Sequence, residues 1–184
     1  KEQKHMISKT SIILAMVGAY SSAYECYSND HQVTELEYWQ GTEEEFPCMY
    51  AGTLFSDEAE QHNMFYWFYR NEDDNADAPL VIWLNGGPGA SSTFANFLMN
   101  GPLRVTRTGD GEDDYAVNRE EKAWTNVSNM VYVDQPVGTG FSYGEPLLTN
   151  MEEAGHEFVN FCLAFLEKYP EFKDKQLYLT GESY

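Results

Sequence analysis

The stretch that decides the fold is residues 80–89, which read Leu-Val-Ile-Trp-Leu-Asn-Gly-Gly-Pro-Gly. The first five residues are continuously apolar, which is typical of a β-strand that is buried on both faces of a sheet. The glycines and the proline that follow favour a turn and therefore end the strand. A short helix is expected within residues 90–98. Strand–loop–helix units of this kind indicate an α/β protein.

Two further segments of the chain have the same form. Residues 130–133, Met-Val-Tyr-Val, predict a second buried strand that ends in the loop Asp-Gln-Pro-Val-Gly-Thr-Gly (134–140). A third strand, residues 176–179, runs directly into Thr-Gly-Glu-Ser-Tyr (180–184). Between them, residues 151–169 carry apolar side chains on one helical face, with Asn150 as the expected N-cap and Pro170 as the stop. Since active sites of such sheets lie at the carboxyl ends of the strands, the three loops are the candidate site.

The region before residue 80 predicts a different kind of structure. Residues 49–55 and 64–70 are rich in β-forming residues and are separated by a polar loop, which indicates an antiparallel hairpin. Together with the strand–loop–helix units, this hairpin predicts a mixed sheet with parallel strands at its centre. Residues 24–47 are polar and acidic, and we expect them to form an arm rather than part of the core.

The last loop carries a candidate nucleophile, Ser183. A catalytic serine is presented on a sharp strand-to-helix turn, with small residues two positions before and after it, and Gly181 fills the first of these positions. Attack on a carbonyl creates an oxyanion, which backbone N–H groups stabilise. The N–H groups of Gly87 and Tyr184 are the candidates, and glycine at position 87 leaves no Cβ in the path of a substrate. A glycine-rich loop followed by Gly-x-Ser in this order favours a serine hydrolase over a simple tight turn.

Three blocks of sequence, residues 83–92, 132–143 and 181–184, resemble the signature blocks of the serine carboxypeptidase family. Residues 50–54 and 65–68 resemble its N-terminal hairpin, so that the resemblance covers residues 48–184. It implies an α/β-hydrolase fold with a mixed, mostly parallel central sheet flanked by helices. It also implies release of C-terminal residues from peptides and proteins through an acyl-enzyme, with no cofactor and no metal ion.

The resemblance assigns a role to each residue of the candidate site. Ser183 corresponds to the nucleophile, and Gly87 and Tyr184 correspond to the oxyanion donors. The residues implied in substrate binding are Trp83, Asn85, Gly86 and Glu182. Asn85 and Glu182 are expected to hydrogen-bond the terminal carboxylate of the substrate. Two facing carboxyl groups require that one of them be protonated, which predicts an acidic pH optimum.

Two positions depart from the family pattern. Ala90 stands where the family usually has a cysteine, so that one family disulfide is expected to be absent. Met99 stands where the family usually has a glutamate that helps to bind the terminal carboxylate, which puts strict carboxypeptidase specificity in question. Two alternatives therefore stay open: a carboxypeptidase-like acyltransferase that uses the same serine, and a non-catalytic homologue that acts by binding.

The partners of the serine are not found after it. The fold orders its triad as Ser, then Asp, then His, whereas the four histidines, His5, His31, His62 and His156, all precede Ser183. His156 lies among the glutamates at the start of the long helix and is expected at its surface. We therefore interpret the sequence as the N-terminal part of a longer carboxypeptidase that is inactive as this piece alone.

The N-terminus and the composition indicate the compartment. A secretory signal is predicted over residues 1–23 from its lysines, its short apolar run 12–19 and the small residues up to Ala23. Met6 could be the initiator, in which case residues 1–5 lie upstream of the signal. The alternative interpretation of this segment is a buried N-terminal helix. The apolar run is too short to cross a bilayer, so no membrane insertion is expected. Residues 24–184 then form the hydrolase part, in an extracellular, lysosomal or vacuolar location. A net charge of −19 argues against binding to nucleic acid or anionic membranes.

Cysteines and the glycosylation motif fit an oxidising compartment. Of Cys26, Cys48 and Cys162, one must lack a partner within the chain, and Cys162 is expected as a buried free thiol because it lies on the apolar helical face. No spacing of Cys and His predicts a metal site. Asn126 begins an Asn-Val-Ser glycosylation motif. The family often forms homodimers, although the sequence indicates no interface.

Overall fold

The computed structural model describes residues 26–183 apart from residues 60 and 74. The predicted secretory signal over residues 1–23 and the candidate oxyanion donor Tyr184 lie outside the described residues. Among the described residues, no helix combines the length and the apolar character that a membrane crossing requires.

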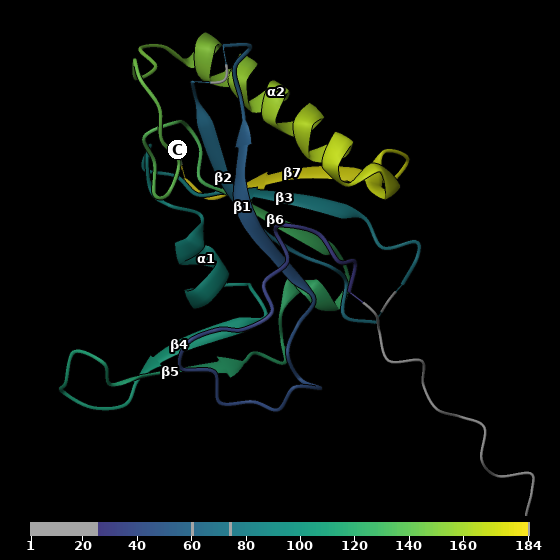
Figure 1. Cartoon of the computed structure of the whole chain (residues 1–184), viewed down its shortest axis with the longest axis vertical. Helices are drawn as coiled ribbons and strands as arrows, with labels where there is room; N and C mark the ends of the chain where they lie inside the picture. The colour runs from purple at the N-terminus through teal and green to yellow at the C-terminus, as the bar shows by residue number, and fades with distance from the viewer. Residues whose placement is uncertain (1–25, 60, 74, 184) are drawn as a thin grey trace, which may run out of the picture.

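The body of the protein is a mixed five-stranded sheet with the strand order β1-β2-β6-β3-β7 (Figure 1). β1 (Met49–Phe55) and β2 (Asn63–Tyr69) form the predicted antiparallel hairpin, and β2 also pairs antiparallel with β6 (Asn129–Val133). β6, β3 (Leu80–Leu84) and β7 (Leu177–Gly181) are parallel to one another. The prediction of a hairpin joined to parallel strands is confirmed, with boundaries that shift by one or two residues.

Both faces of the central strands β3 and β6 are covered, which explains their continuous apolar runs. Along β3, Leu80 and Ile82 contribute to the core on the side of helix α2, and Val81 and Trp83 contribute to the core on the opposite side. β6 divides its side chains between the two cores in the same alternating way. Figure 1 shows α2 on one side of the sheet and the short helix α1 (Thr93–Leu98) on the other.

Helix α2 (Met151–Lys168) builds an aromatic core against the hairpin. Phe161 and Phe165 are fully buried, and the ring of Phe165 lies 5.3 Å from that of Phe68 in an edge-to-face contact. Burying each such side chain contributes about 1.5–3 kcal/mol. The Asn150 side chain accepts a hydrogen bond from the Glu153 N–H at 2.9 Å, which confirms the predicted N-cap. A 3₁₀ turn, Pro170–Phe172, follows the helix.

A second hairpin was not predicted from the sequence. β4 (Leu103–Arg107) and β5 (Tyr115–Arg119) form a separate two-stranded sheet, and the acidic residues 110–114 lie in the turn between them. Figure 1 shows this hairpin beyond α1, on the face of the main sheet opposite α2. Val105 and Val117 pack into the core on that face, while Arg104 and Arg119 are half-buried and form ion pairs with Glu120 and Glu72.

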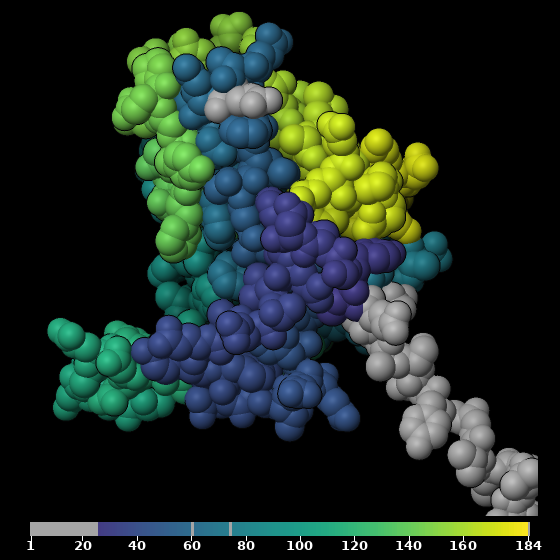
Figure 2. All heavy atoms as spheres, viewed as in Figure 1, coloured from purple at the N-terminus to yellow at the C-terminus, as the bar shows by residue number. Residues whose placement is uncertain are grey.

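The prediction that residues 24–47 form an arm outside the core is wrong for much of this segment. Leu36, Trp39 and Phe46 are partly buried against the core opposite α2. The Val33 N–H donates to the Met49 carbonyl and the Gln40 N–H to the Val117 carbonyl, each at 3.0 Å. In Figure 2 the segment, coloured purple, lies against the body of the molecule. A few apolar residues that are separated by polar ones therefore suffice to anchor an otherwise acidic segment.

Two of the three cysteines form a disulfide, and the third is a free thiol. Cys26 and Cys48 form a disulfide that ties the N-terminal segment to the residue before β1. Cys162 on α2 is free and half-buried, and burial raises the pKa of its thiol to about 11. The thiol is therefore neutral at physiological pH, and the prediction of an unpaired Cys162 in the helix–sheet core is confirmed.

Candidate active site

The loops that follow β3, β6 and β7 meet at one edge of the sheet, as the parallel pairing requires. In Figure 1 the marked C-terminal end lies among these loops. A pocket of about 380 Å³ opens between them and the first turns of α2. Its lining residues come from all four elements: Leu84, Asn85, Pro88, Gly89, Gln135, Pro136, Met151, Ala154, Gly181, Glu182 and Ser183. The predicted convergence of the three loops is present in the structure.

The end of β7 presents Ser183 to this pocket. Gly181 pairs with Leu84 of β3, and the Glu182 N–H donates to the Leu84 carbonyl at 3.1 Å, so that the strand is held up to the residue before the serine. A Cβ at Gly181 would lie 3.3 Å from the same carbonyl oxygen, so glycine suits this close approach. Ser183 is exposed and has φ +62°, a left-handed conformation that costs a non-glycine residue roughly 1–3 kcal/mol. A sharp turn with this strain is the arrangement expected of a nucleophile that follows a strand.

Asn85 is held in the loop after β3 by two hydrogen bonds. Its backbone N–H donates to the Ser92 hydroxyl at 3.0 Å, and its side-chain oxygen accepts from the Trp83 indole N–H at 3.2 Å. The side-chain NH₂ of Asn85 remains as a donor for a ligand in the pocket. Trp83 is 7% exposed and packs edge-on against Trp124, so it supports Asn85 from the core and does not line the pocket.

Gly86 and Gly87 form the tight part of the same loop. The Ala90 N–H donates to the Gly86 carbonyl at 2.9 Å, which closes a turn around Gly87. Gly87 has φ +120°, and a Cβ there would lie 3.0 Å from the Ala90 nitrogen, so a side chain would be strained. Within the described residues, no group accepts a hydrogen bond from the Gly87 N–H. Gly87 lies between two residues that line the pocket, Asn85 and Pro88.

None of the three described histidines lines the pocket. His31 bonds the Tyr66 hydroxyl at 2.6 Å, and burial lowers the pKa of His31. His62 is buried and bonds Glu157 of α2 at 2.5 Å. Burial alone would lower the pKa of His62, but the hydrogen bond and charge of Glu157 outweigh it, so that this pKa is raised. His156 is exposed on α2, as predicted.

The remaining positions singled out from the sequence lie outside the pocket lining. Met99 follows α1, its side chain is 42% exposed, and its carbonyl accepts a hydrogen bond from Arg104 at 3.2 Å. Ala90 is exposed in the loop after β3. Asn126 is half-buried, and its side-chain nitrogen donates to the Glu121 carbonyl at 2.7 Å. A glycan on Asn126 would have to displace this hydrogen bond.

Sequence reasoning missed the α2 side of the pocket. Met151 and Ala154 line it from the first turns of the helix, whereas Gln135 and Pro136 belong to the loop after β6 that was predicted as part of the site. Met151 was placed on the apolar helical face, yet it is 68% exposed at this pocket. Its exposure could have been predicted from its position, because Met151 is the first residue of α2 and precedes the buried Ala154 by nearly one turn.

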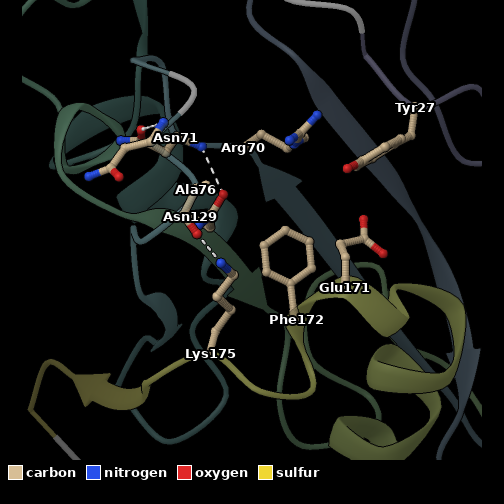
Figure 3. A pocket seen from close by; sticks show the side chains of 9 residues that line it. Tyr27, Arg70, Asn71, Ala76, Asn129, Glu171, Phe172 and Lys175 are labelled. Atoms are coloured by element: carbon tan, nitrogen blue, oxygen red, sulfur yellow. Dashed lines mark hydrogen bonds between the residues drawn. The ribbon is translucent and has the colours of Figure 1, made fainter.

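A second pocket, of about 290 Å³, lies near the opposite ends of the parallel strands (Figure 3). Several of its polar side chains are bonded to the surrounding backbone. Asn129 accepts from the Asn71 N–H at 2.9 Å, and the Lys175 ammonium donates to the Ala76 carbonyl. The guanidinium of Arg70 lies 4.2 Å above the ring centre of Tyr27. This pocket contains none of the residues that the sequence indicated for catalysis.

The sequence and the structure of the chain both resemble those of known carboxypeptidases. The family model described as serine carboxypeptidase matches residues 41–184. A pheromone-processing carboxypeptidase of Ogataea parapolymorpha is 38% identical over 144 residues, which are 75% of this chain and 23% of that protein. The venom serine carboxypeptidase of Apis mellifera is 38% identical over 148 residues, covering 79% and 30% of the two chains.

A solved structure gives the same result. The prohormone-processing carboxypeptidase of Saccharomyces cerevisiae superposes with a TM-score of 0.66 and 30% identity, over 76% of this chain and 32% of that one. The chain thus spans between a fifth and a third of the length of the relatives it matches. Its mixed sheet with flanking helices is the corresponding part of their fold.

Proposed function

Because the chain belongs to the serine carboxypeptidase family, we propose that the complete gene product releases C-terminal residues from peptides and proteins. The observation that carries this proposal is the 380 Å³ pocket, where the ends of β3 and β7 bring together Asn85, Glu182 and Ser183. The strained, exposed turn at Ser183 supports its role as the nucleophile. The relatives compared above carry carboxypeptidase names and no acyltransferase name, which favours peptides as substrates.

The chemistry that we assign to the pocket follows from its groups. The Ser183 hydroxyl attacks the last peptide carbonyl, and the N–H groups of Gly87 and Tyr184 receive the oxyanion. The Asn85 NH₂ and the Glu182 carboxyl bind the terminal carboxylate of the substrate. The serine must lose its proton to a base, and no described histidine lines the pocket. We assign the base and its carboxylate partner to other parts of the complete gene product, since the relatives are more than three times as long as the matched segment.

We also propose that the protein enters the secretory pathway. The disulfide between Cys26 and Cys48 supports this location, because disulfides persist in oxidising compartments. The basic and apolar pattern over residues 1–23 supports it independently. A protein recovered from cells with its first residue at position 24 and the Cys26–Cys48 bond formed would bear out the proposal, and a retained N-terminus with reduced cysteines would contradict it.

The experiment for the activity uses the complete gene product and its Ser183→Ala variant. Each is given a blocked dipeptide with a free terminal carboxylate and the same dipeptide as a terminal amide, from about pH 4 to pH 8. A carboxypeptidase cleaves the free acid in preference to the amide and loses at least ~10³-fold in rate with the alanine variant. Transfer of the acyl group to an alcohol instead of water would identify an acyltransferase. Failure of wild-type Ser183 to react with a fluorophosphonate would identify a non-catalytic homologue.

The same experiment tests two finer expectations. Facing carboxyl groups of Glu182 and the substrate predict that the rate for the free acid is highest in acid, whereas the amide should lack this preference. A rate for the free acid that rises steadily towards pH 8 would contradict this. The consequence of Met99 is read from the ratio of the two substrates, because a weakened hold on the carboxylate brings the rates for acid and amide closer together.

A further inference from the structure

Asp134 is a buried carboxylate at the point where β6 ends. Its side chain belongs to a residue that is 1% exposed, and it accepts three hydrogen bonds. One oxygen accepts from the Ser91 hydroxyl and from the Ser92 N–H, both at 2.7 Å. The other oxygen accepts from the Phe141 N–H at 2.9 Å. The carboxylate therefore joins two loops that are more than forty residues apart in the sequence.

The donors around Asp134 take the place of a counter-ion. Within the described residues, no ion pair involves this carboxylate. A buried charge is tolerated only where hydrogen bonds satisfy it, so the carboxylate and the two loops depend on each other. Gly140 makes the approach feasible, because its φ is +53° and a Cβ there would lie 2.0 Å from the Asp134 oxygen. The close approach of the Asp134 carboxylate thus requires a glycine at position 140 in the loop after β6.

The network continues from Asp134 to the pocket through Ser92. The Ser92 hydroxyl donates to the Val133 carbonyl at 2.6 Å and accepts from the Asn85 N–H at 3.0 Å. Asp134 and the neighbouring carbonyl therefore fix Ser92 by its N–H and its hydroxyl. Ser92 in turn fixes Asn85, the first residue of the loop that contains Gly87. Both ends of that loop are tied to the end of β6.

We propose that Asp134 is a positioning residue for peptide hydrolysis, which holds the Asn85–Gly87 segment in the geometry that the transition state requires. This inference rests on the proposed function, although Asp134 does not touch the substrate. Oxyanion donors act in the transition state, so their displacement lowers kcat more than it raises KM. A displacement of about 1 Å at such a group can lower the rate by roughly 100-fold.

The test compares substitutions of Asp134 with a matched control in the complete gene product. Asp57 is the control, because its carboxylate also accepts two backbone N–H groups, from Gln61 and His62 at 2.9 Å each. Asp57 lies in the loop between β1 and β2 and does not line the pocket. The variants are Asp134→Ala, Asp134→Asn and Asp57→Asn. The readouts are kcat, KM, the rate of fluorophosphonate labelling of Ser183 and the thermal midpoint.

The positioning role predicts a graded result. Asp134→Ala should lower kcat by about 30- to 100-fold and leave KM within about 3-fold, with a parallel fall in the labelling rate. Asp134→Asn should recover part of the rate, because its amide oxygen can still accept from Ser91 and Ser92 while its NH₂ faces the Phe141 N–H. Asp57→Asn should lower only the thermal midpoint.

Other outcomes overturn the inference. A folded Asp134→Ala protein with wild-type kcat would do so, as would an equal loss of kcat in Asp57→Asn. If Asp134→Ala does not fold, Asp134→Asn and Ser91→Ala decide, since each removes only part of the network; unchanged labelling in both would reject the positioning role. A wild type that labels at Ser183 but releases no C-terminal residue would reject the proposed function alone, because labelling still reports on Asp134. A wild type that neither labels nor cleaves would reject both.

Discussion

The two ends of the parallel strands carry pockets of similar size but of different construction. At the carboxyl ends, a volume of about 380 Å³ is bounded by loops that contain positive-φ residues, among them Gly89 and Ser183. At the amino ends, a volume of about 290 Å³ is bounded in part by Asn71, Asn129 and Lys175, whose side chains are bonded to the nearby backbone. Asn71 shows this well, since its side chain donates to the Thr125 carbonyl at 2.9 Å.

The difference shows that the state of the lining groups distinguishes a site better than volume does. At the carboxyl ends, hydrogen bonds hold Asn85 and Glu182 by their backbones and leave side-chain donors and acceptors for a ligand. At the amino ends, the same kinds of side chain are consumed by the fold. Substitutions at the first end should therefore change activity, and those at the second end should change stability.

The largest effect is expected at Gly87, in the complete gene product. Gly87→Ala places a Cβ on a residue with φ +120° and within 3.0 Å of the Ala90 nitrogen. The loop must shift and displace the N–H of Gly87, which we propose as an oxyanion donor, so kcat/KM should fall by about 10²–10³-fold. Gly155→Ala in α2 is the matched control, because nothing lies within 4 Å of its added Cβ. It should leave kcat unchanged and raise the free energy of unfolding by up to about 1 kcal/mol. Equal activity of Gly87→Ala and Gly155→Ala would show that the loop at the carboxyl ends does not determine activity.

The next effect is expected on stability, at Asn129 near the amino ends. Its side chain accepts from the Asn71 N–H at 2.9 Å and donates to the carbonyls of Ala78 and Pro79 at 3.1 and 3.2 Å. Asn129→Ala removes the side-chain partner of the Asn71 N–H and of the Ala78 carbonyl, while the Pro79 carbonyl keeps its bond from the Asn129 backbone N–H, so the free energy of unfolding should fall by about 2–4 kcal/mol. Chemical denaturation measures this loss, and kcat of the folded fraction should stay at the wild-type value. A lower kcat at unchanged stability would mean that this end also belongs to the site.

A pH-dependent effect is expected where α2 meets the first hairpin. His62 bonds Glu157 of α2 at 2.5 Å, and the charge of Asp57 in its own loop also acts on it. Glu157 accepts a second hydrogen bond from the Ser56 hydroxyl at 3.2 Å. Burial opposes the charged form of His62 but Glu157 outweighs it, so the pKa of His62 is raised in the folded state. The stabilisation is therefore complete below the ordinary pKa of about 6.5 and is lost as the pH rises through the raised value.

Substitution of Glu157 makes this dependence measurable. Glu157→Gln should lower the free energy of unfolding by about 1.5–3 kcal/mol near pH 6, the range for a hydrogen bond to a charged group. The deficit should shrink as the pH rises above the raised pKa of His62. Denaturation of both proteins between about pH 5.5 and pH 9 gives the two curves. Curves that stay parallel over this range would show that His62 keeps one charge state in the fold.

The smallest effect is expected at Lys175, which lines the amino-end pocket. Its ammonium donates to the Ala76 carbonyl at the edge of that pocket. Lys175→Met keeps the length of the side chain and removes this hydrogen bond, so the free energy of unfolding should change by no more than about 0.5 kcal/mol. Its kcat/KM should equal that of the wild type for peptide substrates. A substrate-dependent change would show that a ligand uses this pocket.

The sequence predicted those elements whose pattern is decided locally. β3 and β6 are continuous apolar runs because both of their faces are covered, and the glycines at positions 86 and 87 mark the loop between β3 and α1. The hairpin of β4 and β5 was missed because arginines interrupt its apolar side, which consists of little more than Leu103, Val105 and Val117. The packing of Trp39 and Phe46 was missed because each stands alone among polar neighbours.

The candidate site divides in the same way. Ser183 and the loop at Asn85 could be predicted, because a turn after a strand needs glycine and leaves a local signal. The place of Met151 in the pocket could not, since it depends on the angle at which α2 crosses the sheet. Asp134 gave no local signal of its network either, because its three donors come from two loops that only the folded chain brings together.

The strand that presents Ser183 also affects how the 184-residue chain behaves in solution. Among the strands that the structure describes, β7 lies at the edge of the sheet, and Leu177, Tyr178 and Leu179 on it are each about half exposed. An apolar edge strand is a template for pairing with other chains, which mutual repulsion can prevent. At neutral pH a net charge of −19 supplies this repulsion, and acid removes it as carboxylates become protonated. Colloidal stability of this chain should therefore fall towards its pI of about 4.3, where light scattering would detect assembly through β7.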